Sequence, residues 1–169
     1  MTTRRYWLLL ALLLAAGPLA AETRTDYAAI LMGGQKIGHV KSTRTVADGK
    51  VTTRTEMHLS IGRGEVGLKV SQIEQSVETA DGKPLAFSAS QDLALMAKTV
   101  EATVADGQVT ATVTSAAGVE NKQFAWPEGA LLTEGSRLLS LKQGLKEGTR
   151  YSVPVFSPSM LQSLPTEVV

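Results

Sequence analysis

The sequence predicts a mainly β protein, built on a strongly curved antiparallel sheet with one or two short helices. Residues 51–61 alternate strictly, with Val, Thr, Met, Leu and Ile on one side and polar residues on the other. This period of two is typical of a strand that buries one face. The dipeptide Asp-Gly recurs at residues 48–49, 81–82 and 106–107 between strand-like runs. Asp-Gly favours tight hairpin turns, and hairpins in succession predict an antiparallel meander.

The first 21 residues have the features of a secretory signal peptide. Arg4 and Arg5 precede an apolar run at residues 7–16, and small residues lead to Ala21. The run is shorter than the roughly 20 apolar residues that span a bilayer, so we expect a cleaved signal helix instead. Cleavage after Ala21 would place residues 22–169 in the periplasm as a single β-rich domain, with no membrane span remaining.

Composition excludes several classes of function. The 17 Lys and Arg residues nearly balance the 16 Asp and Glu residues, so no basic surface for nucleic acid is indicated. Cysteine is absent, which removes disulfides, thiolate nucleophiles and cysteine metal sites.

The expected elements of the mature chain follow in order. Residues 22–25 should be a disordered stub. Strands are expected at residues 27–32, 37–46, 51–61, 65–79, 85–95, 99–104, 109–114 and 119–126.

The remaining residues predict one helix and one further strand. A helix at residues 134–143 should bury Leu138, Leu139 and Leu141 and end at Gly144, with Leu145 folding back on Leu139. A strand should contain Tyr151, Val153 and Val155. A short helical turn should run from Ser157 until Pro165 ends it. The strand-like ending at residues 167–169 predicts a domain that is incomplete at its C-terminus.

Residues 62–67 match the spacing Gly-x-Gly-x-x-Gly of a dinucleotide-binding loop. That loop must lead into a helix whose N-terminus holds the pyrophosphate. Val66, Leu68 and Val70 alternate at strand period instead, so the motif is interpreted as a hairpin turn.

No catalytic, cofactor or metal residues are assigned from the sequence. His39 and His58 are the only histidines, and Glu56 shares a face with His58. They lack the spacing of a zinc site, so solvated surface histidines are favoured.

Serines lack the nucleophile elbow, and Ser136 and Ser157 resemble helix starts. The carboxylates Glu56, Glu65, Glu74 and Glu78 could in principle pair as acid and base, but solvation of exposed strand faces is the favoured interpretation.

An apolar groove is the remaining candidate site. Its expected lining is Met57, Leu59, Leu68, Leu93, Leu95 and Met96. The alternative is an ordinary sheet core under the helix. Because one helix is little cover for about eight strands, part of an apolar face is expected to stay open.

With these elements placed, the chain resembles the N-terminal region of bacterial periplasmic transglutaminase-like proteins. The resemblance is carried by turn and packing motifs, namely Tyr27, residues 33–38, residues 78–84, residues 144–151 and residues 156–158. It implies a Cys-His-Asp catalytic core downstream, none of whose residues lies in this chain. The strand pattern is also similar to the open-barrel sheet of lipoprotein carrier proteins, which can hold acyl chains.

Two functions follow as hypotheses. The first is a non-catalytic N-terminal accessory domain that positions a downstream catalytic domain or another periplasmic partner. The alternative is a stand-alone periplasmic carrier or sensor that binds an apolar ligand in its curved sheet. Catalysis by this chain ranks below both, because the sequence offers no nucleophile or metal set.

Overall fold

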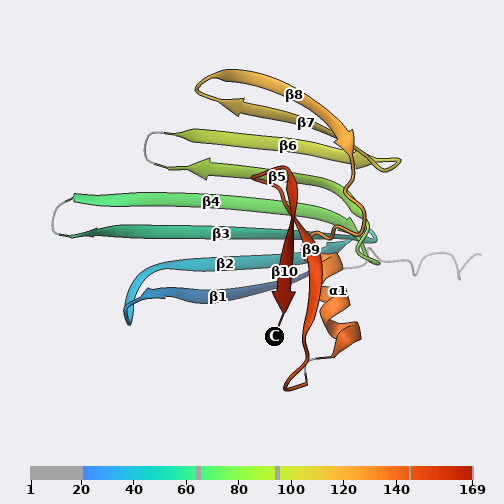
Figure 1. Ribbon diagram of the computed structural model, residues 1–169, viewed down its shortest axis with the longest axis horizontal. Helices are drawn as coiled ribbons and strands as arrows, with labels where there is room; N and C mark the ends of the chain where they lie inside the picture. The colour runs from blue at the N-terminus through green and yellow to red at the C-terminus, as the bar shows by residue number, and fades with distance from the viewer. Residues whose placement is uncertain (1–20, 64–65, 94–95, 145, 169) are drawn as a thin grey trace, which may run out of the picture.

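The computed structural model describes residues 21–168 except residues 64–65, 94–95 and 145. The expected signal helix therefore lies outside the described residues. The described chain folds into an eight-stranded antiparallel sheet in which every strand pairs with its neighbours in sequence (Figure 1). The strands are β1 (Glu22–Met32), β2 (Gln35–Ala47), β3 (Lys50–Arg63), β4 (Val66–Thr79), β5 (Pro84–Asp92), β6 (Ala97–Ala105), β7 (Gln108–Ser115) and β8 (Gly118–Ala125).

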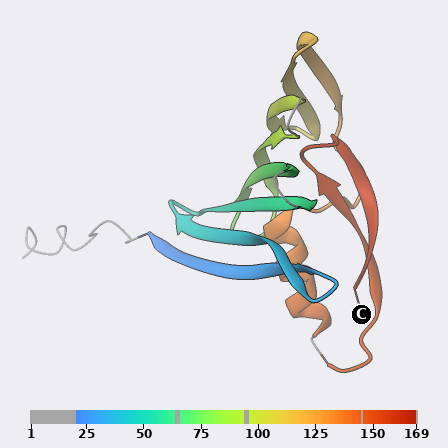
Figure 2. The same ribbon diagram turned by 90° about the vertical axis from the view of Figure 1, so that its left-hand side faces the viewer.

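The sheet is strongly twisted and stays open, since β1 and β8 form its two outer strands (Figure 2). One helix, α1 (Thr133–Gln143), and a two-stranded hairpin of β9 (Tyr151–Ser157) and β10 (Gln162–Val168) follow in the described chain. The predicted mainly β, antiparallel class with a short helix is thus confirmed.

Two of the three Asp-Gly pairs form two-residue hairpin turns. Asp48 and Gly49, like Asp106 and Gly107, all have positive φ angles, as the two central residues of a type I′ turn require. The third pair sits in a longer loop between β4 and β5, where only Gly82 has a positive φ. All three pairs lie at hairpin tips, as predicted.

Both ends of the described chain differ from expectation. The predicted stub at residues 22–25 is ordered as part of β1, because β2 extends far enough for Val46 to pair with Glu22. The predicted helical turn after Ser157 is a single turn, closed by the hydrogen bond from the Leu161 N–H to the Ser157 carbonyl at 2.9 Å, and it ends before Pro165 because β10 begins at Gln162. Pro165 lies inside β10 opposite Pro154. A strand with a free edge tolerates proline, because the missing N–H is not needed there.

The hydrophobic core lies over β5, β6 and β7, away from the long β3–β4 hairpin. Phe156 of β9 is buried against these strands, with its ring centroid 4.6 Å from that of Trp126 and 5.1 Å from that of Phe87. The other buried members are Ala89, Val100, Ala102, Val109, Ala111, Val113, Ala130 and Leu132. The β9–β10 hairpin therefore closes the core from one face of the sheet.

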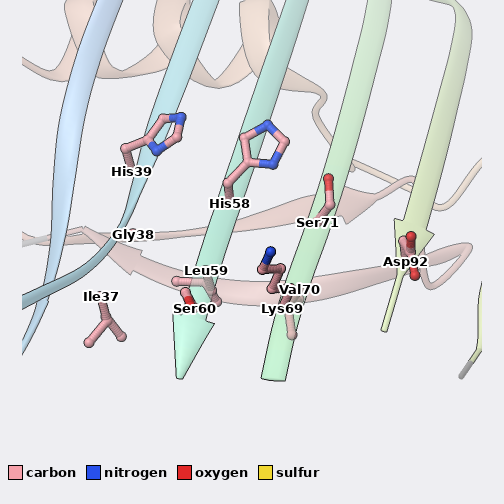
Figure 3. Close-up of a pocket in the computed structure, with 10 residues that line it drawn as sticks. All are labelled: Ile37, Gly38, His39, His58, Leu59, Ser60, Lys69, Val70, Ser71 and Asp92. Carbon is pink, nitrogen blue, oxygen red and sulfur yellow. The ribbon is translucent and has the colours of Figure 1, made fainter. Parts of the chain in front are cut away.

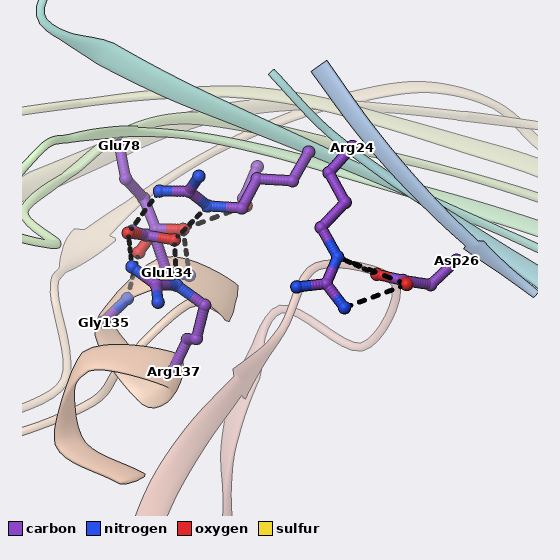
Figure 4. A network of polar contacts seen from close by, with 8 residues as sticks. Arg24, Asp26, Glu78, Glu134, Gly135 and Arg137 are labelled. Atoms are coloured by element: carbon purple, nitrogen blue, oxygen red, sulfur yellow. Dashed lines mark hydrogen bonds and ion pairs between the residues drawn. The ribbon is translucent and has the colours of Figure 1, made fainter. Parts of the chain in front are cut away.

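Helix α1 begins against the end of β4. The Glu78 carboxylate accepts the backbone N–H groups of Glu134 and Gly135, at 2.7 and 2.9 Å, and the hydroxyl of Ser76 at 3.0 Å (Figure 4). An acceptor from the sheet thus satisfies two of the N–H groups that a helix start leaves unpaired. The helix N-cap, Leu132, has no side-chain cap bond.

The helix ends at Gly144, whose φ is positive as expected, whereas the predicted contact of Leu145 lies outside the described residues. Leu138 and Leu139 are half-buried, but Leu141 is 58% exposed, so the apolar side of the helix is narrower than predicted.

Candidate functional site

Helix α1 and the β9–β10 hairpin cover only part of one face of the sheet. Figure 1 shows α1 at the end of the sheet where β4 turns into β5, with β10 crossing the strands nearer their middle. The opposite ends of β1 to β4 extend beyond both elements. We call this region, which runs toward the Gly33–Gly34 turn, the distal half of the sheet.

The face of the distal half that α1 shares carries apolar side chains. Arg44 and Glu78 contact α1, so their side chains mark the face of the sheet that α1 covers. Because side chains alternate along each strand, six apolar residues lie on the same face of the distal half. We call them the distal patch: Ile30, Val40, Met57, Leu59, Leu68 and Val70. Val40 pairs with Met57, and Leu59 pairs with Val70, so the patch is continuous across strands. Leu68 is 48% exposed and the other five are half-buried.

The predicted groove is therefore divided. Met57, Leu59 and Leu68 meet on the distal patch, as expected. Leu93 and Met96 line a separate depression beside the β5–β6 connection, together with residues 115–117. Leu93 follows the end of β5 instead of lying within the predicted longer strand, and Leu95 is outside the described residues.

The opposite face of the distal half carries a row of polar side chains in register. His39 of β2 pairs with His58 of β3, His58 pairs with Ser71 of β4, and Ser71 pairs with Asp92 of β5. These four residues help to line a depression that also includes Ile37, Ser60 and Lys69 (Figure 3). The sequence interpretation of two separate surface histidines missed this juxtaposition. The imidazole centroids lie 5.2 Å apart.

The polar row does not form a hydrolytic triad. In a triad the carboxylate orients the histidine, which in turn activates the serine. Here Ser71 lies between His58 and Asp92 in the strand order, so the carboxylate flanks the hydroxyl and not the imidazole.

Glu56 does not join the histidines, although it is on their face. Its carboxylate lies 3.1 Å from Arg54 and 3.6 Å from Lys41. The hydrogen bond from Arg54 is the main cause that lowers the pKa of Glu56. Glu56 is thus an ion-pair partner of two cations.

The other predicted carboxylates do not gather as an acid–base pair. Glu74 and Glu78 lie on the face opposite Glu56, and Glu65 is outside the described residues. Burial raises the pKa of Glu78, although its hydrogen bonds from the backbone N–H groups and Ser76 oppose this shift. Because those bonds hold the start of α1, Glu78 has a structural role.

A carboxylate that sequence reasoning did not single out accepts four hydrogen bonds from two arginines. Glu134 is 2% exposed and accepts paired hydrogen bonds from Arg44, both at 2.9 Å, and from Arg137, at 2.9 and 2.6 Å (Figure 4). Hydrogen bonds from Arg137 and Arg44 lower the pKa of Glu134 to about 2. This network ties the first turn of α1 to β2, and each arginine donates two hydrogen bonds to the same carboxylate.

The remaining sequence motifs carry no site. Gly62 pairs with Gly67 near the tip of the β3–β4 hairpin, and strand β4 follows in place of the helix that a dinucleotide loop requires. Ser136 lies inside α1 and Ser157 inside β9, so neither starts a helix as predicted. Across the described ranges, no three His, Asp or Glu side chains gather as a metal site.

Comparisons with known proteins returned no matching family model, curated protein or solved structure. Of the helices in the described part of the chain, none is long and apolar enough to cross a membrane.

Proposed function

We propose that the mature chain is a non-catalytic accessory domain of an exported, periplasmic transglutaminase-like protein, and that it docks a partner domain on the distal patch. One observation carries this proposal. The distal patch is a separate apolar cluster beyond α1 and β9–β10, divided from the β5–β7 core by polar residues of the same face such as Thr55, Gln72 and Glu74, and its residue Leu68 is 48% exposed. Apolar surface that a fold leaves contiguous and uncovered is typical of interaction sites.

The geometry favours docking of a protein surface over carriage of a lipid. A carrier must enclose most of an apolar ligand to shield it from water. The sheet is open, α1 packs at one end of β2–β4, and the β9–β10 hairpin crosses the strands nearer their middle, so neither element encloses the distal half. The patch is therefore accessible along the strands, as a surface that packs against another domain would be. An apolar ligand remains the alternative that the experiment must separate.

The first step of the test reads the DNA beyond the codon for Val169. The proposal expects the frame to continue into a Cys-containing core. Co-expression of that core with the mature chain should give a complex that co-elutes in size-exclusion chromatography. A stop codon at that point, in a gene whose neighbours encode no such core, would contradict the proposal.

Two exposed residues on opposite faces give a matched pair of variants. Leu68→Asp places a charge on the distal patch and should abolish co-elution. Tyr27→Asp, at a residue 72% exposed on the other face, should leave the complex intact. If both variants bind the core as the wild type does, the distal patch is not the docking surface. Saturable displacement of a fluorescent fatty acid by the wild type, lost in Leu68→Asp, would instead support the carrier alternative.

A further inference from the structure

The two histidines of the chain lie side by side on the face opposite the distal patch. His39 and His58 are direct partners across β2 and β3, with ring centroids 5.2 Å apart and ring planes inclined by 34°. His39 is exposed and His58 is half-buried. Figure 3 shows both rings rising from neighbouring strands, on the side away from α1.

This separation suits the binding of one metal ion by both rings. With metal–nitrogen bonds of about 2.0–2.1 Å, two imidazoles that meet at a tetrahedral angle have their centroids roughly 5 Å apart. The observed 5.2 Å therefore needs no movement of the strands. Rotation of each ring about its broad terminal torsion changes the direction of its nitrogens without moving the strand.

We propose that His39 and His58 form a two-histidine site for a divalent transition metal ion of the Cu²⁺, Ni²⁺ or Zn²⁺ class. Imidazole is a preferred ligand of these three ions. Each histidine supplies one nitrogen, and water fills the remaining positions. The ion bridges β2 to β3 in the distal half of the sheet.

The neighbouring side chains determine what kind of site this is. Glu56 is held by Arg54 and Lys41 and does not supply a third ligand. Ser71 lies next to His58, and Asp92 lies one strand further away. Because a site with two protein ligands leaves the ion largely hydrated, we expect affinity in the micromolar range and open positions facing solvent. These positions distinguish the site from a closed structural zinc centre.

The inference is independent of the proposed docking function, since the histidines and the distal patch occupy opposite faces. Untagged mature protein is titrated with CuCl₂, NiCl₂ and ZnCl₂ in separate experiments, by isothermal titration calorimetry. Imidazole signals followed by NMR report on both histidines directly, as the chain contains only 2 histidines. We expect one ion per chain, with Cu²⁺ bound most tightly in accordance with the Irving–Williams order.

Three variants test the assignment. His39→Asn and His58→Asn should each weaken binding by roughly tenfold or more, because each removes one of two ligands. Neither side chain is buried, so both variants should keep the wild-type circular dichroism spectrum. Glu56→Gln is the matched control and should leave the affinity within about twofold of wild type. Binding that survives loss of either histidine, or a lack of binding at millimolar metal, would overturn the proposal.

Discussion

Glu78 on β4 accepts the backbone N–H of Glu134 at 2.7 Å, across 56 residues of sequence. Next to this bond, the Glu134 side chain binds Arg44 of β2 and Arg137 of α1. The start of the helix is therefore fixed to two strands through two carboxylates with different roles. Glu78 holds the helix backbone, and Glu134 holds cations from the sheet and the helix.

Replacement of Glu78 by alanine should destabilise the fold by about 1–3 kcal/mol, because the buried N–H groups of Glu134 and Gly135 lose their acceptor. Urea unfolding of wild type and variant measures this difference. Glu74→Ala is the control on the same strand and face, and it should cost clearly less. Equal losses in the two variants would show that the contact with the helix start contributes little.

Replacement of Glu134 by glutamine should cost about 2–3 kcal/mol at pH 7, since Arg44 and Arg137 lose their common carboxylate. The folded-state pKa of Glu134 is lowered to about 2 from 4.5. Its ionised form therefore stabilises the fold above the unfolded-state value, and this contribution is lost as the pH falls toward 2. The difference in unfolding free energy between wild type and E134Q should shrink over that interval. A difference that is constant from pH 7 to pH 2 would contradict the assignment.

Replacement of Gly82 by alanine should destabilise the protein more than the same change at Gly49. Both glycines have positive φ, so each variant pays about 1 kcal/mol for the backbone conformation. A Cβ at Gly82 would also lie 2.7 Å from the Cα of Gly135, whereas a Cβ at Gly49 meets nothing within 4 Å. The clash should add about 1–3 kcal/mol, because α1 must shift from the β4–β5 loop. Thermal unfolding of G82A and G49A compares the two, and equal melting temperatures would refute the close packing.

Truncation of Phe156 to alanine should cost about 3–5 kcal/mol, as expected for a buried aromatic side chain that contacts Phe87 and Trp126. Leu164→Ala, on the partner strand β10 and 37% exposed, should change stability by less than about 1 kcal/mol. Denaturant unfolding of both variants checks the difference. A small effect at Phe156 would mean that the β9–β10 hairpin does not close the core.

The strands and turns were predictable because their signals are local. Asp48–Gly49 and the alternation in β3 each act within a few residues, so sequence alone indicated the β2–β3 hairpin. The Asp48–Gly49 turn also predicts that the two histidines are cross-strand partners. Counting outward from a two-residue turn at Asp48–Gly49 places His39 opposite His58.

The rest of the fold depends on contacts that local patterns do not encode. Asp92 pairs with Ser71 because the register of β4 and β5 shifts between Val77 and Glu78, and no turn motif in the sequence predicted that shift. The core required Phe156 from the distant β9–β10 hairpin. Strand β9 was expected, but its partner β10 was not, because Ser157-Pro158 is also a common helix start. Glu134 was missed because its partner Arg44 lies 90 residues away.

The nearest-neighbour order of the sheet has a consequence for the route of folding. Each strand of the meander can pair as soon as its neighbour in sequence is available, and such local contacts close short loops at low entropic cost. Helix α1 is different, because Glu78 and Arg44 meet it only when β4 and β2 are already in place. We therefore expect the sheet to assemble hairpin by hairpin, and the helix and the β9–β10 hairpin to dock last. In this order the distal half can reach its final form before α1 and the β9–β10 hairpin dock, because neither of them covers it.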